Sequence, residues 1–97
     1  MSGYLFSPAA RADVEHIWDY TAEHWGVDQA ENYLLELQHS IERAVANPRI
    51  GQACDEIRAG YRKLASGSHV LFYRATADDV IDVVRILHQR MDIDRHL

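Results

Sequence analysis

Hydrophobic positions recur at three- and four-residue steps through the first half of the chain. In residues 8–25 the positions that share one helical face are Ala10, Val14, Ile17, Trp18, Thr21 and Trp25. This spacing predicts an amphipathic helix. Ser7 is a good N-cap residue, Pro8 suits the first helical position, and Gly26 is expected to end the helix.

A second helical stripe follows almost at once. It comprises Ala30, Tyr33, Leu34, Leu37, Ile41, Ala44 and Val45. Asp28, with Glu31 three residues later, has the capping-box spacing with aspartate as the N-cap. Asn47 is expected to end the helix because a residue before proline avoids helical geometry. The break of one or two residues between the stripes predicts an antiparallel helical hairpin.

The period of the hydrophobic pattern changes after residue 60. Alternating or β-branched positions predict strands at residues 61–65, 69–74 and 80–88, with turns at 66–68 and 76–79. Three strands joined by short turns form an antiparallel meander. The helical hairpin is expected to cover the apolar face of this meander.

The remaining segments are short. Residues 4–6 are predicted to form an edge strand, residues 49–60 a loop, and residues 91–97 a tail with room for one helical turn. The chain of 97 residues has the size of one compact domain. The sequence thus predicts a single α+β domain over residues 1–97, with an N-terminal strand, an antiparallel helical hairpin and a C-terminal antiparallel β-meander.

Composition narrows the class of protein. The hydrophobic fraction of 47% and the charged fraction of 26% are typical of a globular domain. No apolar run is long enough to cross a bilayer, residues 1–8 lack the basic and apolar stretches of a secretory signal, and one cysteine forms no internal disulfide. A cytoplasmic location is expected.

Charge is distributed unevenly. The formal net charge is −5. Residues 1–55 carry nine acidic against three basic side chains, whereas residues 56–97 carry six against seven. This balance is poor for a general nucleic-acid binder, which needs a net basic face, although it allows a local basic patch.

Metal and nucleophile chemistry have little support in the sequence. The six histidines, His16, His24, His39, His69, His88 and His96, include no i, i+4 pair and no nearby cysteine. Cys54 has no elbow or glycine-rich turn to present its thiol, which favours a half-buried structural cysteine. Phosphate-loop and dinucleotide motifs are also absent, so neither a metal nor a cofactor is predicted.

Arginine, tyrosine and histidine side chains accumulate in the predicted strands. They are Tyr61, Arg62, Tyr73, Arg74, Arg85, His88 and Arg90. Such a group could bind phosphate and assist RNA cleavage. It could equally bind acidic groups of a partner protein, or form surface ion pairs with Asp79 or Asp82. The residue chemistry does not choose between RNA cleavage and protein binding.

Several segments together resemble the ParE toxins of bacterial toxin–antitoxin pairs. They are residues 60–62, 67–74 and 84–92, preceded in the family's order by residues 5–10, Asp13, residues 17–18, 25–26 and 29–30. The resemblance covers nearly the whole chain. It implies the RelE/ParE-type fold, in agreement with the elements predicted from periodicity.

The resemblance also implies a function. ParE toxins are neutralised by a ParD-type antitoxin, which dimerises and binds the operon's DNA, so DNA contact would be indirect. The ParE branch is associated with inhibition of DNA gyrase, and the RelE branch with ribosome-dependent mRNA cleavage. The charge of −5 fits a protein target better than a ribosome-dependent nuclease, which would favour a basic surface. With that choice, the resemblance implies a non-enzymatic gyrase inhibitor in a hetero-oligomer with its antitoxin. The alternatives are an mRNA endonuclease and a non-toxic co-repressor.

Two sets of site residues follow from the resemblance. The target-facing surface is expected to include Arg62, Arg74, Arg85, His88, Gln89, Arg90, Met91 and Asp92. The antitoxin is expected to lie along the hairpin and over the sheet as an amphipathic helix in a groove, contacting Trp18, Trp25, Tyr33 and Leu37. Val84, Leu87 and Phe72 are expected to belong to the core.

Overall fold

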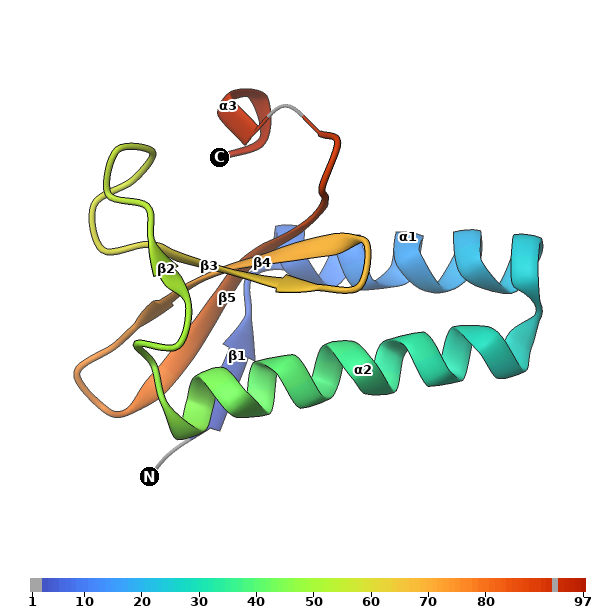
Figure 1. Cartoon of the computed structure of the whole chain (residues 1–97), viewed down its shortest axis with the longest axis horizontal. Coiled ribbons are helices and arrows are strands. Elements are labelled where there is room, and N and C mark those ends of the chain that lie inside the picture. The colour runs from blue at the N-terminus through green and yellow to red at the C-terminus, as the bar shows by residue number, and fades with distance from the viewer. Residues whose placement is uncertain (1–2, 92) are drawn as a thin grey trace.

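The fold begins with a short strand and a helical hairpin. A computed structural model of the protein describes residues 3–91 and 93–97. β1 (Gly3–Phe6) leads into α1 (Pro8–Trp25), and α2 (Val27–Ala46) returns beside it (Figure 1). The Ser7 Oγ accepts a hydrogen bond from the Ala10 N–H at 2.9 Å, and Pro8 is the first helical residue. These features confirm the predicted N-terminus of the first helix.

A single glycine separates the two helices. Gly26 has φ of 94°, a backbone conformation that favours glycine, and it both ends α1 and precedes α2. The predicted capping box at Asp28 is wrong, because α2 starts at Val27 and no side chain caps it. Asp28 instead lies in the first turn, where its charge suits the helix dipole.

The second half of the chain forms most of a five-stranded sheet. Its strands are β2 (Gln52–Ala53), β3 (Arg62–Ser66), β4 (His69–Ala75) and β5 (Val80–His88), in the order β1-β5-β4-β3-β2. The predicted antiparallel meander is confirmed as β3-β4-β5. β1 is an edge strand as predicted and runs parallel to β5. β2 was not predicted, since two residues are too short to show a period.

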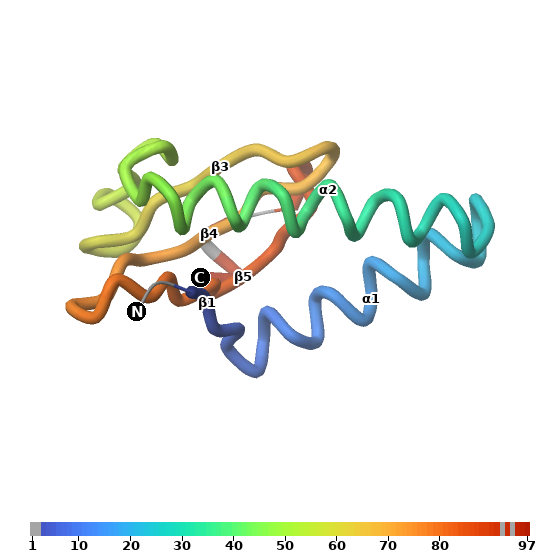
Figure 2. The backbone as a smooth tube through the Cα atoms, turned by 90° about the horizontal axis from the view of Figure 1, so that it is seen from below, coloured from blue at the N-terminus to red at the C-terminus, as the bar shows by residue number. Residues whose placement is uncertain are grey.

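The two faces of the sheet have different covers. α1 and α2 pack on one side, here called the helix-covered face, and project beyond the ends of the strands (Figures 1 and 2). The core on this side contains Ile17, Leu37, Ile41, Leu71, Tyr73, Ile81, Val83 and Ile86. On the other side, the outer face, Phe72, Leu87 and Cys54 are buried beneath the loop after β2 and the short helix α3 (Ile93–His96).

Two of the three residues expected in the core are confirmed, since Phe72 and Leu87 are buried. Val84 is only half-buried and belongs to neither core cluster. Cys54 is fully buried rather than half-buried, and burial raises the pKa of its thiol. No helix within residues 3–91 and 93–97 has both the length and the apolar character needed to cross a membrane.

A β-bulge in β5 determines which side chains reach each face. Phe72 is opposite Arg85 and Tyr73 is opposite Val83, so Val84 is the extra residue. In a regular strand without the bulge, Arg85 would point to the same face as Val83, because side chains two residues apart lie on one face. The bulge therefore turns Arg85 toward the outer face.

Tyr73 anchors the loop that follows α2. Its hydroxyl donates a hydrogen bond to the Pro48 carbonyl at 2.8 Å and accepts one from the Gly51 N–H at 2.9 Å. A Cβ atom at position 51 would lie 2.5 Å from the Tyr73 Oη, so only glycine fits there. Burial raises the pKa of the Tyr73 hydroxyl, which keeps it a neutral donor.

Candidate functional site

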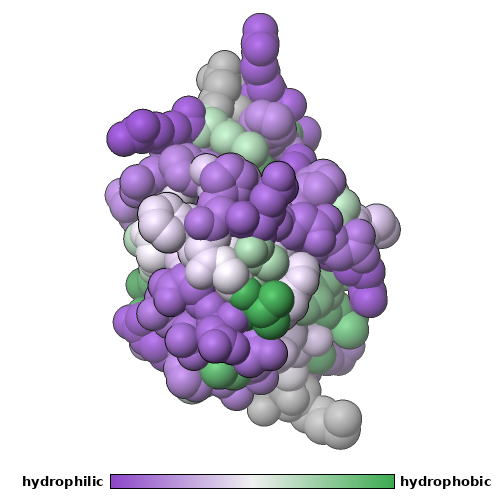
Figure 3. Space-filling model, turned by 90° about the vertical axis from the view of Figure 1, so that its right-hand side faces the viewer, coloured by the Kyte–Doolittle hydropathy of each residue, from purple (hydrophilic) through white to green (hydrophobic). Residues whose placement is uncertain are grey.

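A cleft of about 650 Å³ lies between the projecting hairpin and the ends of β4 and β5. Its lining residues are Asp13, His16, Ile17, Tyr20, Thr21, Trp25, Gln29, Tyr33, Ser68, His69, Ile86, His88 and Met91. Figure 3 views the molecule from the side on which the hairpin projects, where hydrophobic residues form small areas among polar ones. Among the lining residues there is no arginine or lysine.

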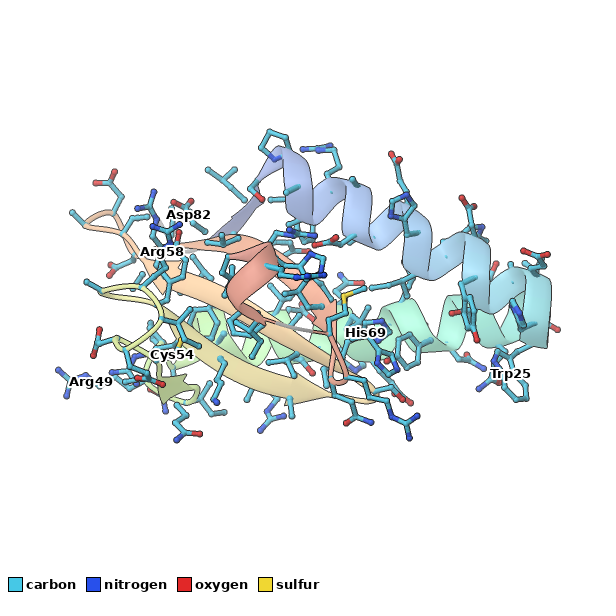
Figure 4. The ribbon with its side chains drawn as sticks, turned by 90° about the horizontal axis from the view of Figure 1, so that it is seen from above. Trp25, Arg49, Cys54, Arg58, His69 and Asp82 are labelled. Carbon is cyan, nitrogen blue, oxygen red and sulfur yellow. The ribbon has the colours of Figure 1, made fainter. Side chains whose placement is uncertain are left out.

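Exposed aromatic rings dominate the outer part of the cleft. Trp25 is 71% exposed at the end of α1, and Tyr20, five residues earlier in the same helix, is 59% exposed. Tyr20 stacks on His24, with the ring centroids 4.0 Å apart. Figure 4 shows Trp25 at the far end of the hairpin. Large exposed aromatic side chains are typical anchors for a partner protein.

The four residues predicted to contact the antitoxin differ in their burial and in whether they line the cleft. Trp25 and Tyr33 both line the cleft. Trp18 is half-buried and is not among the lining residues. Leu37 is 3% exposed and packs in the core of the helix-covered face, so its side chain is not available to a partner that docks on this conformation.

An ion pair forms part of the cleft wall. The Asp13 carboxylate accepts hydrogen bonds from Arg85 Nε at 2.8 Å, from Arg85 Nη2 at 2.9 Å and from the Ile86 N–H at 2.9 Å. β1 ends at Phe6, so this part of the β5 edge has no neighbouring strand. Asp13 takes the place of that strand as a hydrogen-bond acceptor, which explains why a carboxylate is buried in α1.

Arg85 also reaches the C-terminal helix. Its Nη1 donates to the His96 carbonyl at 2.9 Å, while the rest of the guanidinium is bound to Asp13. The hydrogen bonds to Asp13 raise the pKa of Arg85, so the guanidinium stays charged. The donors of Arg85 thus hold together α1, β5 and α3, and its expected role in a target-facing surface stays a prediction.

Two histidines and a tyrosine meet at the inner end of the cleft. His69 and His88 are opposite each other in β4 and β5, with ring centroids 5.4 Å apart. His69 Nδ1 lies 2.6 Å from the Tyr33 hydroxyl, which also accepts a hydrogen bond from the Ser68 N–H at 2.9 Å. Burial, and then the neighbouring His88, lower the pKa of His69.

The other predicted target-facing residues do not form one group. Arg62 donates to the Gly51 carbonyl at 2.8 Å, and Arg74 forms an exposed ion pair with Asp82 at 3.1 Å. Gln89, Arg90 and Met91 follow β5 at the opposite end of the sheet and are exposed. Asp92 lies outside the described residues.

The arrangement separates Arg62 and Arg74 from the two histidines of the cleft. Arg74 and His69 are five residues apart on β4, about 16 Å along an extended strand. Of the predicted target-facing residues, His88 and Met91 line the cleft. The alternative reading of surface ion pairing is confirmed for Arg74 with Asp82.

Sequence reasoning missed several cleft residues on α1. Asp13, His16, Ile17, Tyr20 and Thr21 line the cleft together. Their three- and four-residue spacing was a usable signal, since it places them on one side of a helix. Among the described residues, no three His, Cys, Asp or Glu side chains are placed to hold a metal ion.

Comparison with known proteins identifies the class and the family. The fold matches a structure titled "Chromosomal ParDE TA system from P. aeruginosa" with a TM-score of 0.75 and 22% identity, over 91% of this chain and 95% of that one. Residues 4–93 match the family described as "ParE toxin of type II toxin-antitoxin system, parDE". The chain therefore belongs to the ParE toxin family.

Two curated relatives extend this likeness over the full chain. Toxin ParE1 of Mycobacterium tuberculosis (strain H37Rv) is 71% identical over 96 residues, which are 99% of this chain and 98% of that protein. Toxin ParE1 of Caulobacter vibrioides is 45% identical over 97 residues, which are 100% and 99% of the two chains. The RelE/ParE-type fold expected from the resemblance is confirmed.

Proposed function

We propose that this protein is a toxin that inhibits DNA gyrase by protein–protein binding in the cytoplasm and that a ParD-type antitoxin neutralises it. Membership of the ParE family supports the toxin–antitoxin role. The cleft carries aromatic and apolar side chains suited to a protein partner. In this proposal the protein acts as an inhibitor and not as an enzyme.

The placement of the arginines is the observation that favours a protein target over RNA. The guanidinium groups of Arg62, Arg74 and Arg85 are engaged within the fold, and no arginine or lysine lines the cleft. A nuclease site would need cationic groups that converge on a phosphate. Among the described residues that line the cleft with His69 and His88, no side chain is such a group.

A supercoiling assay tests the proposed target. Purified toxin is expected to inhibit supercoiling of relaxed plasmid by DNA gyrase in a dose-dependent way, and addition of the cognate antitoxin is expected to restore it. Full supercoiling at a large molar excess of folded toxin would reject gyrase as the target. Cleavage of ribosome-bound transcripts on toxin induction, mapped by primer extension, would support the endonuclease alternative instead.

Growth on induction of the lone toxin tests toxicity itself. We expect arrest that co-expression of the antitoxin relieves. Normal growth in the presence of a stable, folded product would support the non-toxic co-repressor alternative.

The cleft is the proposed antitoxin site. An amphipathic helix of the antitoxin would place apolar side chains against Trp25, Tyr20 and Tyr33, as helices do in apolar grooves. Such a helix would also cover His88 and Met91, which line the same cleft. This overlap would let the antitoxin block residues that we assign to the target-facing surface.

Substitution of Trp25 tests this site. Trp25→Ala is expected to weaken antitoxin binding by about 2 kcal/mol or more, the range of a central aromatic anchor, measured by calorimetry. Leu35→Ala is the matched control, since Leu35 is a 51% exposed apolar residue of α2 outside the cleft lining. Equal affinities for the two variants would place the antitoxin elsewhere.

The segment after β5 is the proposed target-facing surface. Gln89, Arg90 and Met91 are exposed and follow His88 directly. The double variant Gln89→Ala/Arg90→Ala is expected to lose gyrase inhibition while its unfolding midpoint stays unchanged. Full inhibition by this variant would move the target-facing surface to Arg62 and Arg74.

A further inference from the structure

The His69–His88 contact lies where three parts of the fold meet. His69 begins β4 directly after the β3–β4 turn, His88 ends β5, and Tyr33 reaches both the turn and His69 from α2. The Gln89 N–H also donates to the Ser68 carbonyl at 2.9 Å. The hydrogen bonds of this junction therefore hold the start of the segment that leaves β5 toward Met91, which lines the cleft.

The hydrogen bonds of both rings are satisfied when the two imidazoles are neutral. The Arg90 N–H donates to His88 Nδ1 at 3.2 Å, so this nitrogen carries no proton. The Tyr33 hydroxyl has one proton, and its contact with His69 Nδ1 at 2.6 Å is much shorter than its contact with the Ser66 carbonyl at 3.5 Å. His69 Nδ1 is thus the acceptor, and the remaining proton of each neutral ring is on Nε2.

Protonation disturbs this arrangement at three points. A proton on His88 Nδ1 faces the Arg90 N–H and removes that hydrogen bond. A proton on His69 Nδ1 forces the Tyr33 hydroxyl to turn toward the distant Ser66 carbonyl. Two charged rings would also be directly opposite each other across β4 and β5, which destabilises a strand pair.

Other charged and titratable groups near the pair do not cancel this effect. From α1 these are Asp13 and His16, from α2 Tyr33 and Glu36, and from β5 and the following segment Arg85 and Arg90. Asp13 favours a charge on His69, but its carboxylate is already bound to Arg85 and to the Ile86 N–H. The effects of burial and of His88 exceed the effect of Asp13, so the pKa of His69 is lowered.

We propose that the facing imidazoles of His69 and His88 form an acid-sensitive joint, which holds residues 89–91 beside the cleft while both rings are neutral and releases them when the pair takes up a proton. The free energy that holds the joint closed is present above the ordinary histidine pKa of 6.5. It decreases as the pH falls through that value, since the unfolded or released state then binds more protons. The decrease stops below the lowered pKa of His69.

Hydrogen exchange on the purified full chain tests the joint without antitoxin or gyrase. Between pH 7 and pH 5.5, after correction for intrinsic exchange rates, the protection factors of the Gln89, Arg90 and Met91 amides are expected to fall by up to about tenfold per pH unit and per excluded proton. His88→Gln is expected to flatten this profile, because a neutral amide can accept from the Arg90 N–H at every pH.

His39→Gln is the matched control. His39 is an exposed histidine of α2 outside the cleft, and its loss is expected to leave the profile unchanged. A pH-independent wild-type profile, or the same slope in His88→Gln and in the wild type, would overturn the proposal. If His88→Gln does not fold, NMR titration of the wild-type rings decides: coupled titration of His69 and His88 supports the joint, and two independent single-site curves reject it.

Discussion

The two faces of the sheet bury apolar side chains under very different covers. The helix-covered face has α1 and α2, of 18 and 20 residues, each with a long stripe of core side chains. The outer face has a loop and α3, which is four residues long. A long helix satisfies most of its own backbone groups, whereas one short turn leaves most of its carbonyls without internal partners.

Two arginine side chains supply hydrogen-bond donors to carbonyl groups at the end of α3. Arg85 donates to the His96 carbonyl and Arg58 to the Leu97 carbonyl, both at 2.9 Å. The stability of the helix-covered face thus depends mainly on the apolar area buried by two long helices. The stability of the outer face depends on a small apolar cluster and on hydrogen bonds from polar side chains. Arg85 belongs to both, because it is also bound to Asp13 of α1.

The substitution expected to cost most is Arg85→Ala, which affects both faces. It leaves the largely buried Asp13 carboxylate with the Ile86 N–H alone and frees the His96 carbonyl. Breaking a buried pair from one side costs about 3–5 kcal/mol of unfolding free energy, which urea denaturation measures. Arg74→Ala is the control, because its ion pair is exposed and is worth about 0–1 kcal/mol. Similar losses in the two variants would contradict the bridging role of Arg85.

Tyr73→Phe tests the helix-covered face by itself. The ring keeps its place in the core, but the buried Gly51 N–H loses its acceptor. We expect a loss of about 1–3 kcal/mol in the free energy of unfolding. Tyr20→Phe, at an exposed position, is expected to leave stability nearly unchanged. An unchanged unfolding midpoint for Tyr73→Phe would show that the loop after α2 needs no such anchor.

Ser7→Ala is expected to have a smaller effect on the same face. The Ser7 hydroxyl caps α1 and also donates to the Val84 carbonyl at 2.6 Å, joining the helix start to β5. Loss of an N-cap costs about 1–2 kcal/mol at the upper end of its range. Ser7→Asp restores the cap acceptor but not the donor. Thermal unfolding of the two variants therefore separates the contribution of the N-cap from that of the hydrogen bond to Val84. If both variants are as stable as the wild type, neither interaction contributes to stability.

Arg58→Ala is expected to affect the outer face least in equilibrium terms. It removes an exposed hydrogen bond to the Leu97 carbonyl, so the global free energy of unfolding should fall by about 0.5 kcal/mol or less. Hydrogen exchange of the α3 amides should nevertheless accelerate, because the last turn opens locally. Unchanged exchange in α3 would show that apolar packing of Ile93 and Leu97 holds the helix without this tether.

Much of the fold was readable from local patterns. Local hydrophobic periodicity or turn residues predicted most elements of the fold. These are the two helices, the single-glycine break, the three meander strands and the N-terminal edge strand. β2 and the true start of α2 were not readable. A two-residue strand has no period, and Gly26 takes over the capping position that Asp28 was expected to fill.

The candidate site was less predictable than the fold. Trp25, Tyr33, His88 and Met91 were expected at functional surfaces and do line the cleft. The arginines were expected to form one surface, but Arg62 and Arg74 lie toward one end of the sheet and residues 88–91 toward the other. The order of the strands along the chain predicts which strands are adjacent. It does not predict how far apart two side chains lie along those strands.

Local sequence was sufficient to predict most of the helices and strands, the family and the acidic character of the first half of the chain. Those properties depend on residue type and on short spacings. Tertiary structure decided the role of Arg85, the burial of Asp13 and the meeting of His69 with His88. Each of these contacts joins residues far apart in the sequence. The one-residue bulge at Val84, which no local sequence pattern predicts, turns Arg85 to the outer face.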